Sequence, residues 1–390
     1  MKKLIKNFIY SIVDCYKCSL YKKNHSKELI NYLKATGIQL EHQEKESEFL
    51  TLWSKLMPSG KINMGLYRFY AHYLGDDPKI ITDDVFHITV EPCLNCQGAV
   101  SVFGDKNMFE RILPKEYFPI CIVRNMEYDY MDQNYHIIKM DKVEFNKRVL
   151  QNEDLCNKGK IIVKPTKDSS GGMGVRLFIF NGEKWVNNEG DTLTLGYLEE
   201  KYKRNFIIQQ TLEPCNFVKQ FNPTSYSTFR IFTYRSVMDD KPHFIGGYLR
   251  IGAKNSFKDN IWGGGYAIPI NNDGTLADYA SDAQRKRYDC VNGINLKEKD
   301  FVIPNWNRVI NLCYDIAVKV IPNRLLSFDI ILDENEEPRC IEFNSKNQTV
   351  TTVQTTSKPF FGEYTEEVIS YCKNHMGKRI YPITIEKTNY

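Results

Sequence analysis

A polar hairpin near the C-terminal end of the sequence carries acidic residues at positions that can face each other. In FDIILDENEEPRCIEFN, the turn residues Asp333–Pro338 separate two apolar segments, a pattern typical of a β-hairpin. A symmetric register sets Leu332 opposite Arg339. The same register sets Asp329 opposite Glu342 and brings two carboxylates together across the strands.

Facing carboxylates in partly apolar surroundings repel each other, so this pairing is costly without a cation between them. Asn344 lies two residues beyond Glu342 on the same strand face and adds a third oxygen. Oxygen-only ligands suit Mg²⁺ better than zinc. The sequence therefore predicts a magnesium site at Asp329, Glu342 and Asn344. The alternative is a solvated hairpin with ordinary surface acids.

A glycine-rich segment, KPTKDSSGGMGV, follows an apolar strand that ends at Lys164. Hydroxyl groups and flexible, closely approaching backbone suit a flap that covers phosphates. The spacing fits neither a Walker P-loop nor a dinucleotide-binding fingerprint. A plain flexible turn is the alternative. The flap residues to test are Ser169, Ser170, Gly171, Gly172 and Gly174.

The elements that must position these residues form an α+β pattern. Helical periodicity extends from residue 1 to about Ile80. Asp105 is a good N-cap for a short helix to Leu113. Strands are predicted at Phe118–Val123, Lys160–Lys164, Val175–Phe180, Phe206–Gln210, Ser227–Tyr234, Phe244–Ile251 and Phe328–Leu332, and helices at Asn307–Val320 and Tyr364–Lys373. We expect mostly antiparallel sheets.

Length and composition narrow the fold and the function only broadly. A chain of 390 residues favours more than one lobe, and a formal charge of +4 gives no sign of a nucleic-acid protein. Eleven cysteines favour reduced thiols and a cytoplasmic location. The pairs Cys15/Cys18 and Cys93/Cys96 leave a zinc site as an alternative to buried thiols. The basic, partly apolar N-terminal segment predicts a packed amphipathic helix, with peripheral membrane contact as an alternative.

Together the motifs resemble the ATP-grasp superfamily, in which a Val-Lys-Pro strand, a glycine-rich flap, a hinge strand and an acidic hairpin occur in this order. NPTSYSTFRIFT, LRIGAKNSFKDNIWGGG and IEFNSKNQ are most similar to the ATP-grasp proteins associated with sugar transfer and surface-polysaccharide loci. The resemblance implies an ATP-grasp fold in which two α+β lobes clasp ATP. It divides the chain into a helical N-terminal region (1–100), an N-terminal lobe with the flap (101–212) and a C-terminal lobe with the metal hairpin (213–390).

The resemblance also implies residue roles. Lys106 and Lys164 would contact ATP phosphates beneath the flap. Arg230 and Arg250 would lie near the γ-phosphate and the acylphosphate, because guanidinium groups bind oxyanions bidentately. Asn260, with the glycines 263–265, would form a close-approach loop at the reacting centre, with Lys254 as a further phosphate contact.

The hinge that meets adenine would consist of Gln209, Gln210 and Leu212. Many relatives have glutamate where this sequence has glutamine, and an amide oxygen can still accept a hydrogen bond from the adenine amino group. The sequence does not locate the ribose-binding acid.

The resemblance implies an ATP-dependent carboxylate–amine ligase that uses Mg²⁺ and forms an acylphosphate. Its partners would be a small-molecule carboxylate and an amine, free or glycan-linked, such as a sugar acid or surface-polysaccharide precursor. Two alternatives stay open: an ATP-grasp phosphotransferase acting on a hydroxyl group, and a non-catalytic ATP-binding scaffold in polysaccharide biosynthesis. Oligomeric state cannot be read from the sequence.

Overall fold

The computed structural model of the chain describes residues 2–167, 172–254, 256 and 258–376. The predicted flap residues Ser169, Ser170 and Gly171 lie outside the described residues. The α-helices are α1 (Lys2–Thr36), α2 (Glu46–Trp53), α3 (Met64–Leu74), α4 (Asp83–Val85), α5 (Glu91–Leu94), α6 (Val100–Phe103), α7 (Phe109–Ile112), α8 (Lys142–Phe145), α9 (Glu153–Lys158), α10 (Leu195–Lys201), α11 (Asn216–Lys219), α12 (Trp306–Lys319), α13 (Val350–Thr356) and α14 (Thr365–His375).

The strands belong to a mixed helix-and-sheet fold in which every described pairing is antiparallel, as predicted. They are β1 (Cys121–Met126), β2 (Asp129–Met131), β3 (Ile137–Ile138), β4 (Lys160–Pro165), β5 (Arg176–Phe180), β6 (Trp185–Asn187), β7 (Phe206–Gln210), β8 (Thr228–Arg235), β9 (Pro242–Ile251), β10 (Tyr266–Pro269), β11 (Ala280–Ser281), β12 (Arg287–Tyr288), β13 (Cys290–Val291), β14 (Ile294–Asn295), β15 (Leu325–Leu332) and β16 (Pro338–Asn344).

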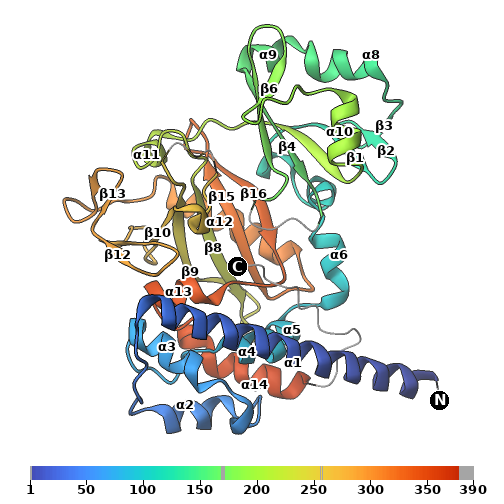
Figure 1. The fold of residues 1–390 in the computed structure, drawn as a ribbon. Coiled ribbons are helices and arrows are strands. Elements are labelled where there is room, and N and C mark those ends of the chain that lie inside the picture. The colour runs from blue at the N-terminus through green and yellow to red at the C-terminus, as the bar shows by residue number, and fades with distance from the viewer. Residues whose placement is uncertain (1, 168–171, 255, 257, 377–390) are drawn as a thin grey trace.

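Helices dominate the N-terminal region, as the periodicity predicted, and Figure 1 shows α1, α2 and α3 beside α14 at one end of the molecule. Their core contains Phe49, Trp53 and Tyr67, each fully buried. The same core includes Val353 of α13 and Ile369 of α14. The helical region is thus built from both ends of the described chain. The division at residues 100 and 212 stays a prediction.

Helix α1 is long but polar. Its first turns leave Ile5, Phe8 and Ile12 exposed. No helix among the described residues is both long and apolar enough to cross a bilayer. Peripheral membrane contact and a cytoplasmic location stay predictions. The described residues also contain no group of three histidine, cysteine or acidic side chains placed to hold a metal ion.

The first large sheet has the strand order β3-β2-β1-β7-β4-β5-β6. Its core packs Ile161 and Val163 of β4 against residues such as Phe145 and Trp185. Strands β4 and β5 pair as the hairpin that was predicted around the glycine-rich segment. This sheet therefore holds the base of the flap on a rigid element.

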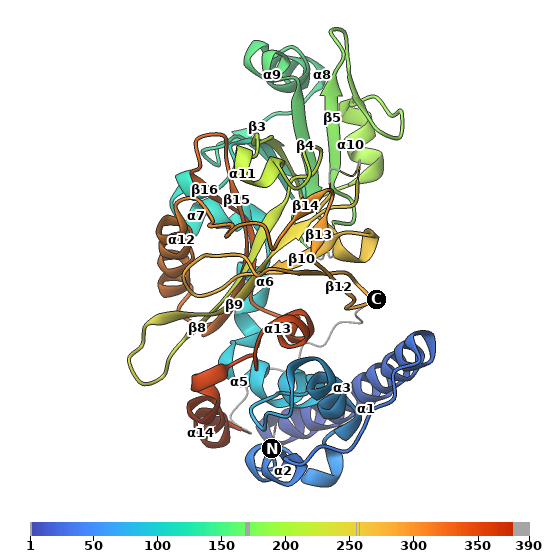
Figure 2. The same cartoon turned by 90° about the vertical axis from the view of Figure 1, so that its left-hand side faces the viewer.

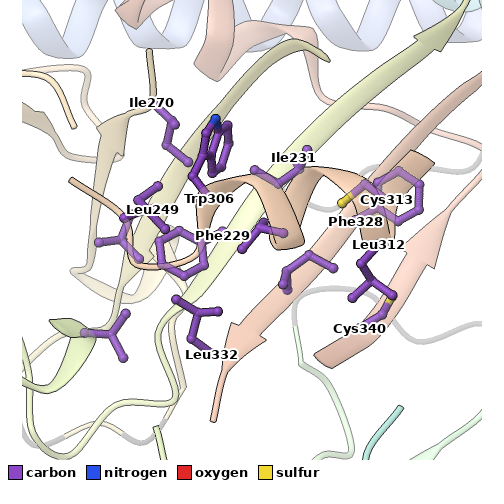
Figure 3. Close-up of a cluster of buried hydrophobic side chains, with 14 of the residues drawn as sticks. Phe229, Ile231, Leu249, Ile270, Trp306, Leu312, Cys313, Phe328, Leu332 and Cys340 are labelled. Carbon is purple, nitrogen blue, oxygen red and sulfur yellow. The ribbon is translucent and has the colours of Figure 1, made fainter. Parts of the chain in front are cut away.

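The second large sheet has the order β12-β11-β10-β9-β8-β15-β16, and helix α12 covers one face (Figure 2). Figure 3 shows the core between them, where Phe229 and Leu249 of the sheet lie near Trp306 of α12, and Phe328 lies near Cys313. Because side chains alternate along a strand, Thr228, Arg230 and Phe232 belong to the opposite face. Phe232 packs into the helical region, whereas Thr228 and Arg230 carry polar groups that line a cavity.

The predicted hairpin register is correct at one end only. Asp329 lies opposite Glu342, as predicted, but Leu332 pairs with Pro338 rather than with Arg339. A bulge between Asp329 and Ile330 accounts for the shift, because it adds a residue to β16 and displaces the pairing nearer the turn.

Candidate active site

A cavity of about 200 Å³ lies between the two large sheets and gathers most of the predicted site residues. The predicted residues that line it are Lys106, Lys164, Gly172, Gln209, Gln210, Leu212, Arg230, Arg250, Asn260, Asp329 and Glu342. Gly174 and Asn344 do not line it. These positions come from segments that are distant in the sequence, so the fold brings them together.

Asp329 stands between two arginines. Arg230 Nε lies 2.5 Å from Asp329 Oδ1, and Arg250 Nη2 lies 2.9 Å from Asp329 Oδ2. The strands dictate this contact, because Asp329 and Arg230 are direct neighbours across β15 and β8. Asp329 is 4% exposed, so pairing with cations offsets the cost of burying its charge.

Glu342 contacts a lysine from the other side of the cavity. Lys106 Nζ lies 3.0 Å from Glu342 Oε2, and Asn344 Nδ2 lies 3.5 Å from Glu342 Oε1. Burial alone raises the pKa of Glu342, but Lys106 and the other nearby cations outweigh burial and lower it. Glu342 is therefore ionised at neutral pH.

A capped turn positions Lys106. The backbone N–H of Asn107 donates to Asp105 Oδ1 at 3.0 Å, at the start of the 3-10 turn η4 (Lys106–Met108) that leads into α7. The predicted N-cap is confirmed, although the first turn is 3-10 rather than α-helical. This turn directs Lys106 toward the acidic hairpin.

Oxygen donors suitable for Mg²⁺ are present at the predicted hairpin. Asp329 and Glu342 face each other and line the cavity, and the Asn344 amide lies next to Glu342. Two carboxylates and an amide fit a hard cation. The assignment of these residues as metal ligands stays a prediction.

Lys164 is buried at the end of β4, with 5% exposure. Its Nζ donates to the backbone carbonyl of Ile341 at 3.4 Å. Burial, and then the nearby charge of Lys106, lower the pKa of Lys164 to about 8. A buried ammonium that faces an open cavity provides a strong electrostatic site for a phosphate group.

Asp259 is an acidic cavity residue that sequence reasoning missed. Arg250 Nε lies 3.1 Å from Asp259 Oδ2, and the Thr228 hydroxyl donates to the same oxygen. Burial raises the pKa of Asp259, although Arg250 opposes the shift. Its position directly before Asn260, in a segment already singled out, was the one available signal.

Asn260 has a structural contact in this loop. Its Oδ1 accepts the backbone N–H of Trp262 at 3.0 Å and caps the turn η7 (Ile261–Gly263). The predicted close approach occurs at Gly265, where a Cβ atom would lie 2.3 Å from the Ile251 carbonyl oxygen. Asn260 thus lines the cavity and also shapes the loop.

Lys258, also missed by sequence reasoning, joins the flap to the second sheet. Its Nζ donates to the Gly172 carbonyl oxygen at 3.1 Å. Gly172 has φ +73°, a left-handed conformation that glycine adopts easily. Lys254, the predicted phosphate contact, does not line the cavity.

The apolar end of the cavity is formed by Ile162, Ile331 and Ile341 beside the predicted hinge. Gln210 Oε1 accepts from Lys158 Nζ at 2.7 Å, and Gln209 Nε2 donates to the Pro119 carbonyl at 3.2 Å. Apolar walls next to a few amide groups suit a flat heterocyclic base.

The sequence matches the family described as "Sugar-transfer associated ATP-grasp" over residues 86–366. This confirms the resemblance drawn from the motifs. ATP and Mg²⁺ are the cofactors of ATP-grasp enzymes, so the family match also confirms the cofactor prediction at that level. No curated protein matches this chain.

Solved structures share low sequence identity with the chain. The ATP-grasp ligase PsnB with its minimal precursor is 12% identical, with a TM-score of 0.38 over 71% of this chain and 63% of that one. The biotin carboxylase domain of Hydrogenobacter thermophilus 2-oxoglutarate carboxylase is 12% identical, with a TM-score of 0.41 over 74% and 48%. The PurK synthetase in complex with ADP is 9% identical, with a TM-score of 0.34 over 64% and 47%. The chain spans less than two thirds of each of these proteins, and at these TM-scores they carry no argument about its activity.

Proposed function

Because the chain belongs to the sugar-transfer associated ATP-grasp family, we propose that it is a Mg-ATP-dependent ligase that activates a carboxylate as an acylphosphate and joins it to an amine. The observation that carries this proposal is the charge of the cavity. Of the described side chains that line it, five are cationic and three are acidic. Such an excess of cations favours a ligand that brings phosphates and a carboxylate.

The proposed placement of ATP follows the chemistry of the cavity walls. The base would lie at the apolar end, next to Gln209 and Leu212, and the phosphates would point to Lys106 and Lys164. Mg²⁺, when bound at Asp329, Glu342 and Asn344, supplies charge neutralisation for the phosphate oxygens.

In the first proposed step, a carboxylate oxygen of the substrate attacks the γ-phosphorus of ATP. A new P–O bond forms, the bond to the β-phosphate oxygen breaks, and ADP leaves with its electron pair. Arg230 and Arg250 line the cavity and, in this proposal, would hold the incoming carboxylate and the γ-phosphoryl oxygens. Holding both anions in one orientation is the chain's main contribution to this step.

In the second proposed step, the neutral amine attacks the acyl carbon and phosphate leaves. The C–N bond forms, the C–O bond to phosphate breaks, and the nitrogen passes one proton to the departing phosphate. Water would destroy the acylphosphate. The contact of Lys258 with Gly172 supports a flap that excludes water during this step.

A sugar acid or a surface-polysaccharide precursor is the proposed carboxylate or amine partner. This narrower proposal is supported by the family description alone. The phosphotransferase and scaffold alternatives are separated from the ligase by the following experiment.

The test measures ADP release with Mg-ATP across a panel of uronic acids and amines. The double variant D329A/E342A removes the predicted metal carboxylates, and E337A removes a half-buried acid of the same hairpin, paired with Arg308 and not among the cavity-lining residues, as the matched control. Turnover that needs both an acid and an amine, and that is lost only in the double variant, is the expected result. ADP release with a hydroxyl acceptor alone would favour the phosphotransferase. Tight ATP binding without ADP release across the panel would favour the scaffold.

A further inference from the structure

A second cavity, of about 320 Å³, lies where the helical region meets the second sheet. Its walls come from α1, α3 and α4 on one side, and from α13, β10, β11 and the loop after β11 on the other. Figure 1 shows α13 between α1 and the sheet, which is the layer where this cavity occurs. The ATP site described above does not use any residue of this cavity.

The two cavities adjoin on one face of the second sheet. Thr228, Arg250, Ala267 and Ser281 are direct neighbours across β8, β9, β10 and β11. The first pair lines the ATP cavity and the second pair lines the second cavity. Since neighbouring strands are about 4.8 Å apart, Arg250 and Ser281 lie roughly 10 Å apart in the sheet. A substrate in the second cavity can therefore reach toward the arginines.

The loop after β9 also shows that the two cavities are close to each other. Asn260 lines the ATP cavity, whereas the next residues, Ile261 and Trp262, line the second cavity. One short turn, η7, thus forms the partition between them. A group that passes this partition reaches the site where the acylphosphate would form.

Asp83 is the deepest charged group in the second cavity, with 5% exposure. The Tyr70 hydroxyl donates to Asp83 Oδ2, and the Thr351 hydroxyl donates weakly to Oδ1 at 3.4 Å. Among the described residues Asp83 has no ion pair with a lysine, arginine or histidine. A buried carboxylate without a cationic partner is costly, so the cavity favours a cation.

Two further carboxylates in the cavity act in the same direction, and one guanidinium opposes them. Glu28 and Asp282 add two carboxylates, and Arg285 is the one guanidinium among the described lining residues. Burial lowers the pKa of His25, despite the opposing charge of Asp83, so His25 is neutral at pH 7. The second cavity is therefore net acidic, whereas the ATP cavity is net basic.

Arg285 is already engaged by aromatic rings and does not neutralise Asp83. Its guanidinium carbon lies 4.6 Å from the ring centroid of Tyr32 and 5.1 Å from that of Phe69. Burial, and then the charge of Asp83, raise the pKa of Glu28, and the nearest ring nitrogen, Nδ1 of the neutral His25, lies 3.6 Å from Glu28 Oε2. Asp83 and Glu28 thus form an acidic pair at one wall of the cavity.

Hydroxyl groups and an aromatic ring complete the lining. Thr349, Thr351, Thr352 and Thr355 contribute hydroxyls from α13 and the residue before it. Trp262, which is 55% exposed, lines the cavity beside the partition. Many hydroxyls next to an accessible ring suit a ligand with several hydroxyl groups of its own.

We propose that the second cavity binds the amine substrate, a primary amine on a hydroxyl-rich body of the size of a sugar, with Asp83 and Glu28 as the partners of its ammonium group. This inference rests on the proposed ligase function, in which the ammonium group must lose a proton and approach the acylphosphate as the neutral amine. The opposite charges of the two cavities separate the substrates. The triphosphate and the carboxylate bind among the arginines and lysines, and the amine binds among the acids.

Direct binding to the full chain tests the inference without requiring turnover. Titration calorimetry with glucosamine, and with glucose as the neutral probe of the same shape, isolates the contribution of the ammonium group. We expect glucosamine to bind at least about tenfold more tightly than glucose, because a hydrogen bond to a charged partner is worth more than a neutral one. D83N should remove most of this preference.

D84N is the matched control. Asp84 is the next residue of α4, is also buried, and accepts the Asn63 backbone N–H at 2.9 Å, but it does not line the cavity. We expect D84N to leave the preference for glucosamine within about threefold of wild type. If D83N does not fold, E28Q provides the same test from a less buried position. Equal binding of the two sugars, or an unchanged preference in both D83N and E28Q, would overturn the inference.

Mg-ATP binding, measured on the same samples, separates this inference from the proposed function. D83N should keep the wild-type affinity for Mg-ATP. Amine-dependent ADP release with the same amine KM in D83N, E28Q and wild type would contradict the second cavity and leave the ligase in place. Preferential glucosamine binding in a chain that never releases ADP would contradict the ligase and leave the binding site in place.

Discussion

Arg250 contacts Asp329 through Nη2 at 2.9 Å, and the same side chain reaches Asp259 through Nε at 3.1 Å. One guanidinium therefore links an acid of the hairpin predicted to bind metal to an acid of the loop that separates the two cavities. Both acids raise the pKa of Arg250, although burial opposes them. All three side chains line the first cavity, so this link stabilises the charges on its wall.

Replacing Arg250 tests the link. R250A leaves two buried carboxylates without their shared partner, which should cost about 3–5 kcal/mol of unfolding free energy. R250K keeps the charge but cannot form the same forked contacts, so it should restore much of the stability and little of the activity. Chemical denaturation and ADP release measure the two effects. Equal activity of R250K and wild type would contradict a bidentate role.

The lowered pKa of Lys164 predicts that ATP binding depends on pH. Its pKa is lowered to about 8, so the ammonium is charged below that pH and loses its proton as the pH rises above it. ATP affinity should therefore be highest below pH 8 and should fall between about pH 8 and 9. Binding phosphates near pH 8 should also take up a proton, because the phosphates favour the charged form.

K164R is the control for this effect, since arginine keeps its charge through the same pH range. Its ATP affinity should stay nearly flat between pH 7 and 9. Calorimetry in buffers of different ionisation enthalpy detects the proton uptake by wild type. A falling affinity of similar size in K164R would assign the pH dependence to another group.

Alanine variants of Lys258 and Lys254 test whether the observed flap contact or the predicted phosphate contact matters for ATP binding. K258A removes the bond to the Gly172 carbonyl, so the flap should close less well and the KM for ATP should rise by about three- to tenfold. K254A should change little, because Lys254 does not line the cavity. Steady-state kinetics distinguish the two variants. A larger effect of K254A would support the original sequence prediction over the observed geometry.

Two glycines of the same loop give a matched pair. A Cβ at Gly265 would lie 2.3 Å from the Ile251 carbonyl oxygen, whereas one at Gly263 would be 3.8 Å from its nearest neighbour, Asn260 Cβ. G265A should displace the loop and lower both the melting temperature and the activity, and G263A should be close to wild type. Thermal unfolding measures the melting temperatures of the two variants, and ADP release measures their activities. Similar behaviour of the two variants would contradict the close packing of the loop.

The sequence by itself determined the local elements and the residues that they carry. Short apolar runs predicted the strands around Lys164 and Asp329, and every residue of β15 is buried. The pairing of Asp329 with Glu342 followed from a single local hairpin. The bulge that shifts Leu332 onto Pro338 was not visible, since it depends on neighbours that the hairpin does not contain.

Only the tertiary structure decided which charges meet. Arg250 links Asp259 to Asp329, and Asp83 faces a cavity shared with α1 and α13, through contacts between segments far apart in the sequence. No local pattern encodes such contacts, because they depend on how whole sheets and helices pack. The sequence therefore predicted an ATP site from ordered motifs, whereas the second, acidic cavity became visible only in the packing of the helical region against the sheet.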